Sequence, residues 1–91
     1  MKPSLLVVDD EQNIRNFFKE YFEKKGFEVY IANNWKNANE KIFSYPVDVI
    51  LLDFQLPGKN GLEILKDIKD QFPLIEIIIF SGKANIKLAV E

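Results

Sequence analysis

Short apolar runs recur along the chain, and each predicts a β-strand. The runs Leu5–Val8, Val47–Asp53 and Ile75–Phe80 are nearly continuous and rich in valine, isoleucine and leucine. That composition is typical of strands buried on both faces of a parallel sheet. Phe27–Ile31 alternates less cleanly but is aromatic and β-branched, which favours a strand at an edge of the sheet. The pattern therefore predicts four strands.

Apolar residues at helical spacing fill the intervals between these runs. The interval after the first run repeats apolar residues at i, i+3, i+4, i+7 and i+8, which is one face of an amphipathic helix. Gly26 can supply the left-handed residue that ends this helix. The members of this face are Ile14, Phe17, Phe18, Tyr21 and Phe22.

Two further helices and the start of another are predicted downstream. Asn33 and Asn34 can cap a helix that ends near Tyr45-Pro46, and a third helix must end at Pro73. We expect Asn85–Glu91 to begin a fourth helix. The apolar faces are Trp35, Ala38, Ile42 and Phe43 for the second helix, and Leu62, Leu65, Ile68 and Phe72 for the third.

Strands that alternate with helices predict a parallel sheet with right-handed crossovers and helices on both faces. We expect an open α/β sheet of the flavodoxin-like kind with strand order 2-1-3-4, where the usual order in this class is 2-1-3-4-5. A chain of 91 residues is one domain, so residues 1–91 are expected to fold as a unit.

The amino-acid composition excludes several kinds of catalytic and metal site. The sequence holds neither cysteine nor histidine, which excludes thiolate and imidazole metal sites, histidine triads and phosphohistidine chemistry on this chain. The net charge of −2 is too small to indicate nucleic-acid or membrane binding through bulk electrostatics. Because no apolar run is long enough to span a bilayer and no signal-peptide pattern is present, we expect a soluble, cytoplasmic domain without membrane contact.

Acidic residues follow two of the buried runs. Asp9 and Asp10 follow the first strand, Asp53 ends the third, and Ser81 follows the fourth. In open parallel sheets the ligand crevice lies at the carboxyl ends of the strands, at the switch point between strands 1 and 3. Carboxylates that converge there repel one another unless a cation binds. Oxygen donors alone favour a hard ion, namely Mg²⁺, with Mn²⁺ and Ca²⁺ as alternatives.

Simpler roles are open for each of these residues. Asp10 and Glu11 could stabilise the N-terminus of the first helix through its dipole, and Asp53 could cap a loop. Ser81 before Gly82 could be a turn residue. Their common position on one rim of the sheet favours a site, in which a carboxylate could act as a nucleophile and form an aspartyl phosphate.

Several segments resemble the receiver domain of two-component response regulators. They are Val7–Glu11, Leu51–Asp53, Ile79–Gly82 and the D-x-x-L-P-x-x-x-G element from Asp53 to Gly61. Ala89–Glu91 and the Ser81-Gly82 pair are similar to receivers of nitrogen-regulatory-class transcription activators.

The resemblance implies a phosphoacceptor module rather than an enzyme. Asp53 would accept a phosphoryl group from the phosphohistidine of a sensor histidine kinase. Asp10 would bind Mg²⁺ directly, Asp9 would assist, and the backbone carbonyl of Gln55 would complete the protein ligands.

The resemblance also assigns roles around the acceptor. Ser81 would hydrogen-bond a phosphoryl oxygen and act as the switch hydroxyl, while Pro57 and Gly61 would shape the loop beside the site. In a parent protein the output, including any nucleic-acid binding, would belong to a domain beyond residue 91.

The family also has a fifth strand that ends in a lysine, and a fifth helix, which the resemblance does not locate here. We therefore expect a C-terminally truncated receiver whose fourth strand is an exposed edge, and which dimerises through that edge, swaps elements between copies, or is only partly ordered. The alternative function is an inactive, self-associating fragment. A flavin-binding domain is disfavoured because Asp9-Asp10-Glu11 would repel phosphate, and an aspartate-based phosphatase would need D-x-D after the first strand.

Overall fold

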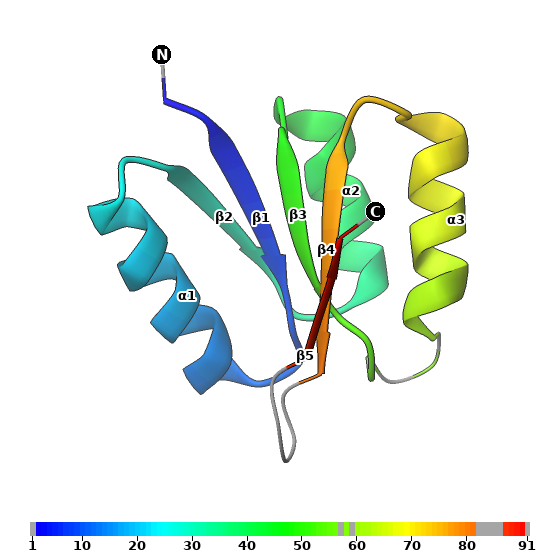
Figure 1. The fold of residues 1–91 in the computed structure, drawn as a ribbon, viewed down its shortest axis with the longest axis horizontal. Coiled ribbons are helices and arrows are strands. Elements are labelled where there is room, and N and C mark those ends of the chain that lie inside the picture. Colours follow the sequence, from blue (N-terminus) through cyan, green and yellow to red (C-terminus); the bar gives the residue numbers. More distant parts are fainter. Residues whose placement is uncertain (1, 57, 59, 82–86, 91) are drawn as a thin grey trace.

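The computed structural model describes residues 2–56, 58, 60–81 and 87–90, with the backbone alone described at 81 and 87–90. Strands and helices alternate from the N-terminus until two strands follow one another at the end (Figure 1). The elements are β1 (Ser4–Val8), α1 (Gln12–Lys24), β2 (Glu28–Ala32), α2 (Trp35–Ser44), β3 (Val49–Asp53), α3 (Gly61–Gln71), β4 (Glu76–Ser81) and β5 (Lys87–Val90).

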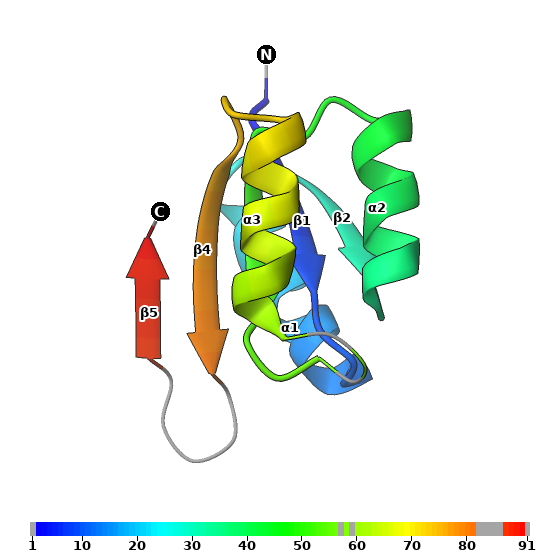
Figure 2. The same ribbon diagram turned by 90° about the vertical axis from the view of Figure 1, so that its right-hand side faces the viewer.

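The strands form one sheet in the order β2-β1-β3-β4-β5, and the first four are parallel. α1 lies on one face of the sheet, and α2 and α3 lie on the other (Figures 1 and 2). The predicted α/β sheet with strand order 2-1-3-4 and helices on both faces is confirmed. None of the helices in the described ranges is long and apolar enough to cross a bilayer.

The C-terminal segment differs from the prediction. A helix was expected from Asn85, but Lys87–Val90 is a strand that runs antiparallel to β4, with Ile78 opposite Val90 and Ser81 opposite Lys87. A segment this short carries too little periodicity to separate helix from strand. The open edge of β4 offers a row of unpaired N–H and C=O groups, which is a template for another strand.

The prediction of an exposed β4 edge is therefore wrong, because β5 covers that edge along Ile78–Ser81. Self-association through β4 loses the structural basis on which it was predicted. The same pairing makes β5 the outer strand, as Figure 2 shows.

Two apolar layers hold the sheet. The layer under α2 and α3 is the larger, and it contains Leu6, Ile50, Ile64 and Ile77, which are completely buried. The layer under α1 centres on Phe80, whose ring meets the Phe18 ring edge-on at 5.4 Å. Because β1, β3 and β4 lie between these two apolar layers, the ends of the strands, which carry the polar residues, are fixed in position.

The predicted helix boundaries have clear physical causes. Asn34 caps α2 by accepting a hydrogen bond from the backbone N–H of Asn37 at 2.7 Å, as predicted. Asn60 caps α3 in the same way by accepting from the N–H of Glu63 at 2.9 Å. Gly26 follows α1 with φ of +94°, the left-handed conformation expected at this stop.

The position of Ile77 allows a direct test of the larger layer. Ile77→Ala should lower the free energy of unfolding by about 2–5 kcal/mol, because it leaves a cavity between β4 and α3. Leu74→Ala is the matched control, since the Leu74 side chain is 93% exposed and its truncation should change stability by less than about 0.5 kcal/mol. Urea denaturation measures both, and equal losses would contradict this packing.

Candidate functional site

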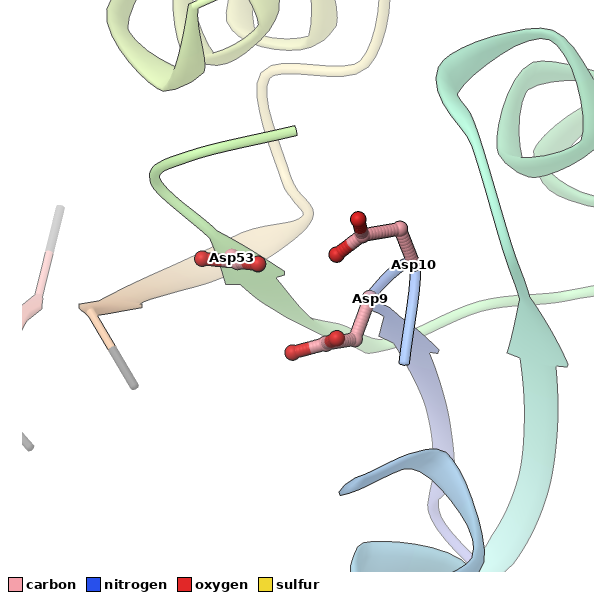
Figure 3. A group of neighbouring side chains, drawn as sticks. All are labelled: Asp9, Asp10 and Asp53. Carbon is pink, nitrogen blue, oxygen red and sulfur yellow. The ribbon is translucent and has the colours of Figure 1, made fainter. Parts of the chain in front are cut away.

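Three aspartates converge where β1 and β3 end. One carboxylate oxygen from each of Asp9, Asp10 and Asp53 lies within 4.8 Å of the others (Figure 3). The register explains this, because Val8 is opposite Leu52 and the next residue on each strand is therefore an aspartate at the same level. Asp9 and Asp53 are buried, with 3% and 8% of their surface exposed, while Asp10 is exposed. The predicted convergence is confirmed.

The position of Asp9 is fixed by hydrogen bonds to three neighbours. Its backbone N–H donates to the carbonyl oxygen of Ala32 at 3.1 Å, and its Oδ1 accepts from the N–H of Glu11 at 2.7 Å. Arg15 Nη1 donates to the carbonyl oxygen of Asp9 at 2.7 Å. These contacts tie the end of β1 to β2 and to the first turn of α1, so the Asp9 carboxylate is held in one orientation.

The simpler role open for Asp10 and Glu11 is stabilisation of the N-terminus of α1 through the helix dipole. The N-cap residue is Glu11, and its side chain makes no capping hydrogen bond. The first turn of α1 contains no acidic residue either. Asp9 Oδ1 does accept a hydrogen bond at the start of the helix, from the N–H of Glu11, and the interaction of Asp10 and Glu11 with the helix dipole stays a prediction.

Asp53 ends β3 at a tight turn. The N–H of Phe54 donates to the carbonyl oxygen of Phe80 at 2.8 Å, which continues the β3–β4 pairing one residue past the strand. The N–H of Gln55 donates to Asp53 Oδ1 at 3.0 Å and orients the carboxylate. Gln55 is exposed in this turn, and the predicted role of its carbonyl oxygen as a metal ligand stays a prediction.

The electrostatics of the cluster are unfavourable without a cation. The pKa of Asp9 is raised from 3.8 to about 6: burial is the largest cause, the hydrogen bond from the N–H of Glu11 opposes it, and the negative charges of Asp53, Asp10 and Glu11 add to the rise. A carboxylate in this position is costly to ionise because it loses water and gains negative neighbours.

The donor set fits a hard divalent cation. All three side chains offer carboxylate oxygens, and such ions bind oxygen donors. The exposed Asp10 lies on the solvent side of the two buried acids, so an ion held here would keep access to water. This is the single group of three or more acidic side chains close enough to share an ion in the described part of the chain.

Of Ser81 and Pro57, two other predicted site residues, the structure describes only the backbone of Ser81. Ser81 is the last residue of β4, and Phe80 is opposite Asp53, so the backbone of Ser81 lies one residue past the level of Asp53 on the adjacent strand. The Ser81 hydroxyl and the whole of Pro57 lie outside the described residues.

Gly61 shapes the loop by close approach. Its N–H donates to the carbonyl oxygen of Phe54 at 3.2 Å, and a Cβ added at Gly61 would lie 3.0 Å from Phe54 Cα and 3.3 Å from that oxygen. Only glycine fits without a shift of the backbone that follows Asp53. The loop-shaping role predicted for Gly61 agrees with this contact.

Sequence reasoning missed Arg15. Its guanidinium reaches back across the start of α1 to the backbone of Asp9, six residues earlier. Arg15 is the one arginine of the sequence, and the helical period places it in the first turn of α1, but no spacing rule indicates that it contacts Asp9. Its contact depends on the turn between β1 and α1, which becomes visible only in three dimensions.

The raised pKa of Asp9 predicts that the stability of the fold depends on pH. The pKa of Asp9 is higher in the folded chain than its ordinary value, so the folded state binds more protons between about pH 4 and 6, and stability falls as pH rises through that window. Asp9→Asn removes the charge and keeps an oxygen that can accept from Glu11. In metal-free buffer at pH 7.5 it should raise the free energy of unfolding by about 1–3 kcal/mol, with the gain lost near pH 4.

Chemical denaturation at the two pH values measures this effect. Glu40→Gln makes the same chemical change at an exposed position of α2 and should alter stability by less than about 0.5 kcal/mol at both. An Asp9→Asn variant that is less stable than the parent at pH 7.5 would show that the carboxylates do not repel as described.

The contact of Gly61 generates a second prediction. Gly61→Ala should destabilise the fold by about 1–3 kcal/mol, because the methyl group must displace the backbone at Phe54. Leu62→Ala, at an exposed position one residue later in α3, should cost less than about 0.5 kcal/mol. Thermal unfolding of the two variants measures the difference, and a neutral Gly61→Ala would contradict the close approach.

The chain is similar in sequence to known response regulators. Residues 5–91 match the family model of the response regulator receiver domain. An NtrX-like response regulator of Rickettsia typhi is 39% identical over 88 residues, which cover 94% of this chain and 18% of that protein. Regulatory protein AtoC of Escherichia coli is 32% identical over 87 residues, covering 96% and 19%.

A solved structure shares both fold and sequence. The response regulator TrrA from Thermotoga maritima, in complex with Mg²⁺-BeF, superimposes with a TM-score of 0.83 and 38% identity over 92% of this chain and 72% of that one. The chain spans about a fifth of the length of the two curated relatives named above.

Proposed function

The chain belongs to the response regulator receiver domain family, and from that premise we propose that it is a Mg²⁺-dependent phosphoacceptor whose acceptor residue is Asp53. The observation that carries the proposal is the convergence of three carboxylates at the ends of β1 and β3. That place is the switch point of the sheet, where parallel α/β folds bind their ligands.

The proposed chemistry is transfer of a phosphoryl group from a sensor histidine kinase. An oxygen of the Asp53 carboxylate attacks the phosphorus atom, the phosphorus–nitrogen bond of the phosphohistidine breaks, and the electron pair of that bond returns to the imidazole. The product is an aspartyl phosphate. The hydrogen bond from the N–H of Gln55 to Asp53 Oδ1 fixes the orientation of the carboxylate for this attack.

Asp9 and Asp10 hold the metal ion in this proposal, with the backbone carbonyl of Gln55 as a further ligand. Bound Mg²⁺ would offset negative charge on the transferred group and on the acids themselves. Asp9 is positioned for this by its bonds to Ala32 and Glu11. The likeness to TrrA, whose structure contains Mg²⁺-BeF, supports the choice of ion.

The other roles follow from family membership. Ser81 would act as the switch hydroxyl, and Pro57 with Gly61 would shape the acceptor loop. The domain would accept and pass on a signal in the cytoplasm without turning over a substrate of its own. Transcription control, or any other output, would belong to the longer proteins of which such domains are part.

Incubation with acetyl phosphate and Mg²⁺, followed by intact mass measurement, tests the proposal. We expect a gain of one phosphoryl group that requires Mg²⁺ and disappears in Asp53→Asn. Asp70→Asn, which removes an exposed carboxylate at the far end of α3, should keep the gain. Asp10→Asn should lower the extent of modification because it removes a metal ligand.

Two results would contradict the assignment. A gain that persists in Asp53→Asn would locate the acceptor elsewhere. No gain in the parent, with folding intact by circular dichroism, would favour the alternative of an inactive, self-associating fragment.

A further inference from the structure

A second polar site lies at the outer edge of the sheet, where β2 ends. A groove of about 280 Å³ opens between the start of α1 and the first turns of α2. Ile31 and Ala32 contribute its apolar lining, and the polar lining consists of Arg15, Asn33, Asn37 and Lys41. Figure 2 shows α2 alongside β2 at this edge. The lining contains no acidic side chain.

The two cations of the groove lack acidic partners within the described part of the chain. The ion pairs found there are Lys19 with Glu23 and Lys24 with Glu20, both on the surface of α1. Arg15 and Lys41 are each partly buried, and both line the groove. Two positive charges that line one groove repel each other, and an anion bound between them would offset that repulsion.

Arg15 is held in place for this role. Its Nη1 donates to the carbonyl oxygen of Asp9 at 2.7 Å, which uses one N–H of the guanidinium and fixes the group beside the groove. A guanidinium has five N–H donors in a planar fork that matches the oxygens of carboxylate and phosphate groups. The preorganised arginine thus leaves donors available for an anion.

The polar side chains from α2 complete a donor set. Asn37 and Lys41 are one helical turn apart and therefore lie on the same side of α2. Lys41 supplies an ammonium group, and Asn33 and Asn37 supply carboxamide N–H groups. A guanidinium, an ammonium and two carboxamides together are the chemistry of an oxyanion site.

The size of the groove limits the ligand. Its volume of about 280 Å³ lies just below the range of about 300–1,000 Å³ found for drug-sized ligands. We propose that the groove formed by Arg15, Asn33, Asn37 and Lys41 binds a small free oxyanion, either a phosphate or a small carboxylate. This site is separate from the acidic cluster and goes beyond the phosphoryl transfer proposed above.

Titration of the ¹⁵N-labelled chain by NMR in metal-free buffer at constant ionic strength tests the site. Inorganic phosphate and succinate are the probes, and sodium chloride is the reference for screening. We expect saturable shifts of the side-chain amides of Asn33 and Asn37, with a dissociation constant of about 1–10 mM for a few charge-assisted hydrogen bonds. Saturation by phosphate alone or by succinate alone would support the site and identify its ligand class.

Matched lysine variants locate the binding. Lys41→Gln should raise the dissociation constant by about tenfold, as expected for one lost charge-assisted hydrogen bond. Lys36→Gln makes the same change at an exposed position of α2 and should shift it by less than about twofold. Lys41→Arg keeps the charge and should restore binding to within about threefold, which separates charge from folding effects.

Three outcomes would overturn the proposal. They are shifts that rise linearly with both probes, equal weakening by Lys41→Gln and Lys36→Gln, and shifts that centre on the backbone amides of Asp53 and Gln55 without shifts of the Asn33 and Asn37 side-chain amides. Because Lys41 is not part of the acidic cluster, Lys41→Gln should still gain a phosphoryl group from acetyl phosphate. Failure of anion binding can therefore be told apart from failure of the phosphoacceptor function.

Discussion

Repulsion among three carboxylates at the ends of β1 and β3 is the constraint on which the rest of this structure depends. Asp9 and Asp53 are buried there, and Asp10 stands at the rim. Burial and the neighbouring charges together raise the pKa of Asp9 to about 6, so the apo site carries an electrostatic cost at neutral pH. A divalent cation bound here would offset that cost and so link the stability of the fold to the proposed chemistry of the site.

The fold keeps the carboxylates together against this repulsion through backbone contacts. The parallel register of β1 and β3 places the two buried aspartates at one level, and the two apolar layers hold these strands in place. Beyond the strands, Asp9 forms hydrogen bonds with Ala32 and Glu11, and a hydrogen bond from the N–H of Gln55 orients the Asp53 carboxylate. The close approach of Gly61 to Phe54 fixes the turn that follows. The acids therefore cannot relax apart without loss of sheet or turn contacts.

The parts of this arrangement that could be predicted from sequence are those with a strong period or a topological rule. The buried strands and the amphipathic α1 follow from apolar spacing, and the meeting of Asp9 with Asp53 follows from the order of parallel strands. The strand at Lys87–Val90 could not be predicted, because four residues carry no decisive period and the pairing depends on the open edge of β4. The contact of Arg15 with the backbone of Asp9 depends on turn geometry, which no spacing rule supplies.

The most direct test of the central claim is urea unfolding of the chain at pH 7.5 as a function of Mg²⁺ concentration, with NaCl at matched ionic strength as the reference. If the acidic cluster binds the ion in the folded state alone, the free energy of unfolding should rise with the logarithm of Mg²⁺ concentration and reach about 2.7 kcal/mol at a hundred times the dissociation constant. The rise should be absent in Asp10→Asn. A free energy of unfolding that does not depend on Mg²⁺, or depends on it equally in Asp10→Asn, would contradict the account.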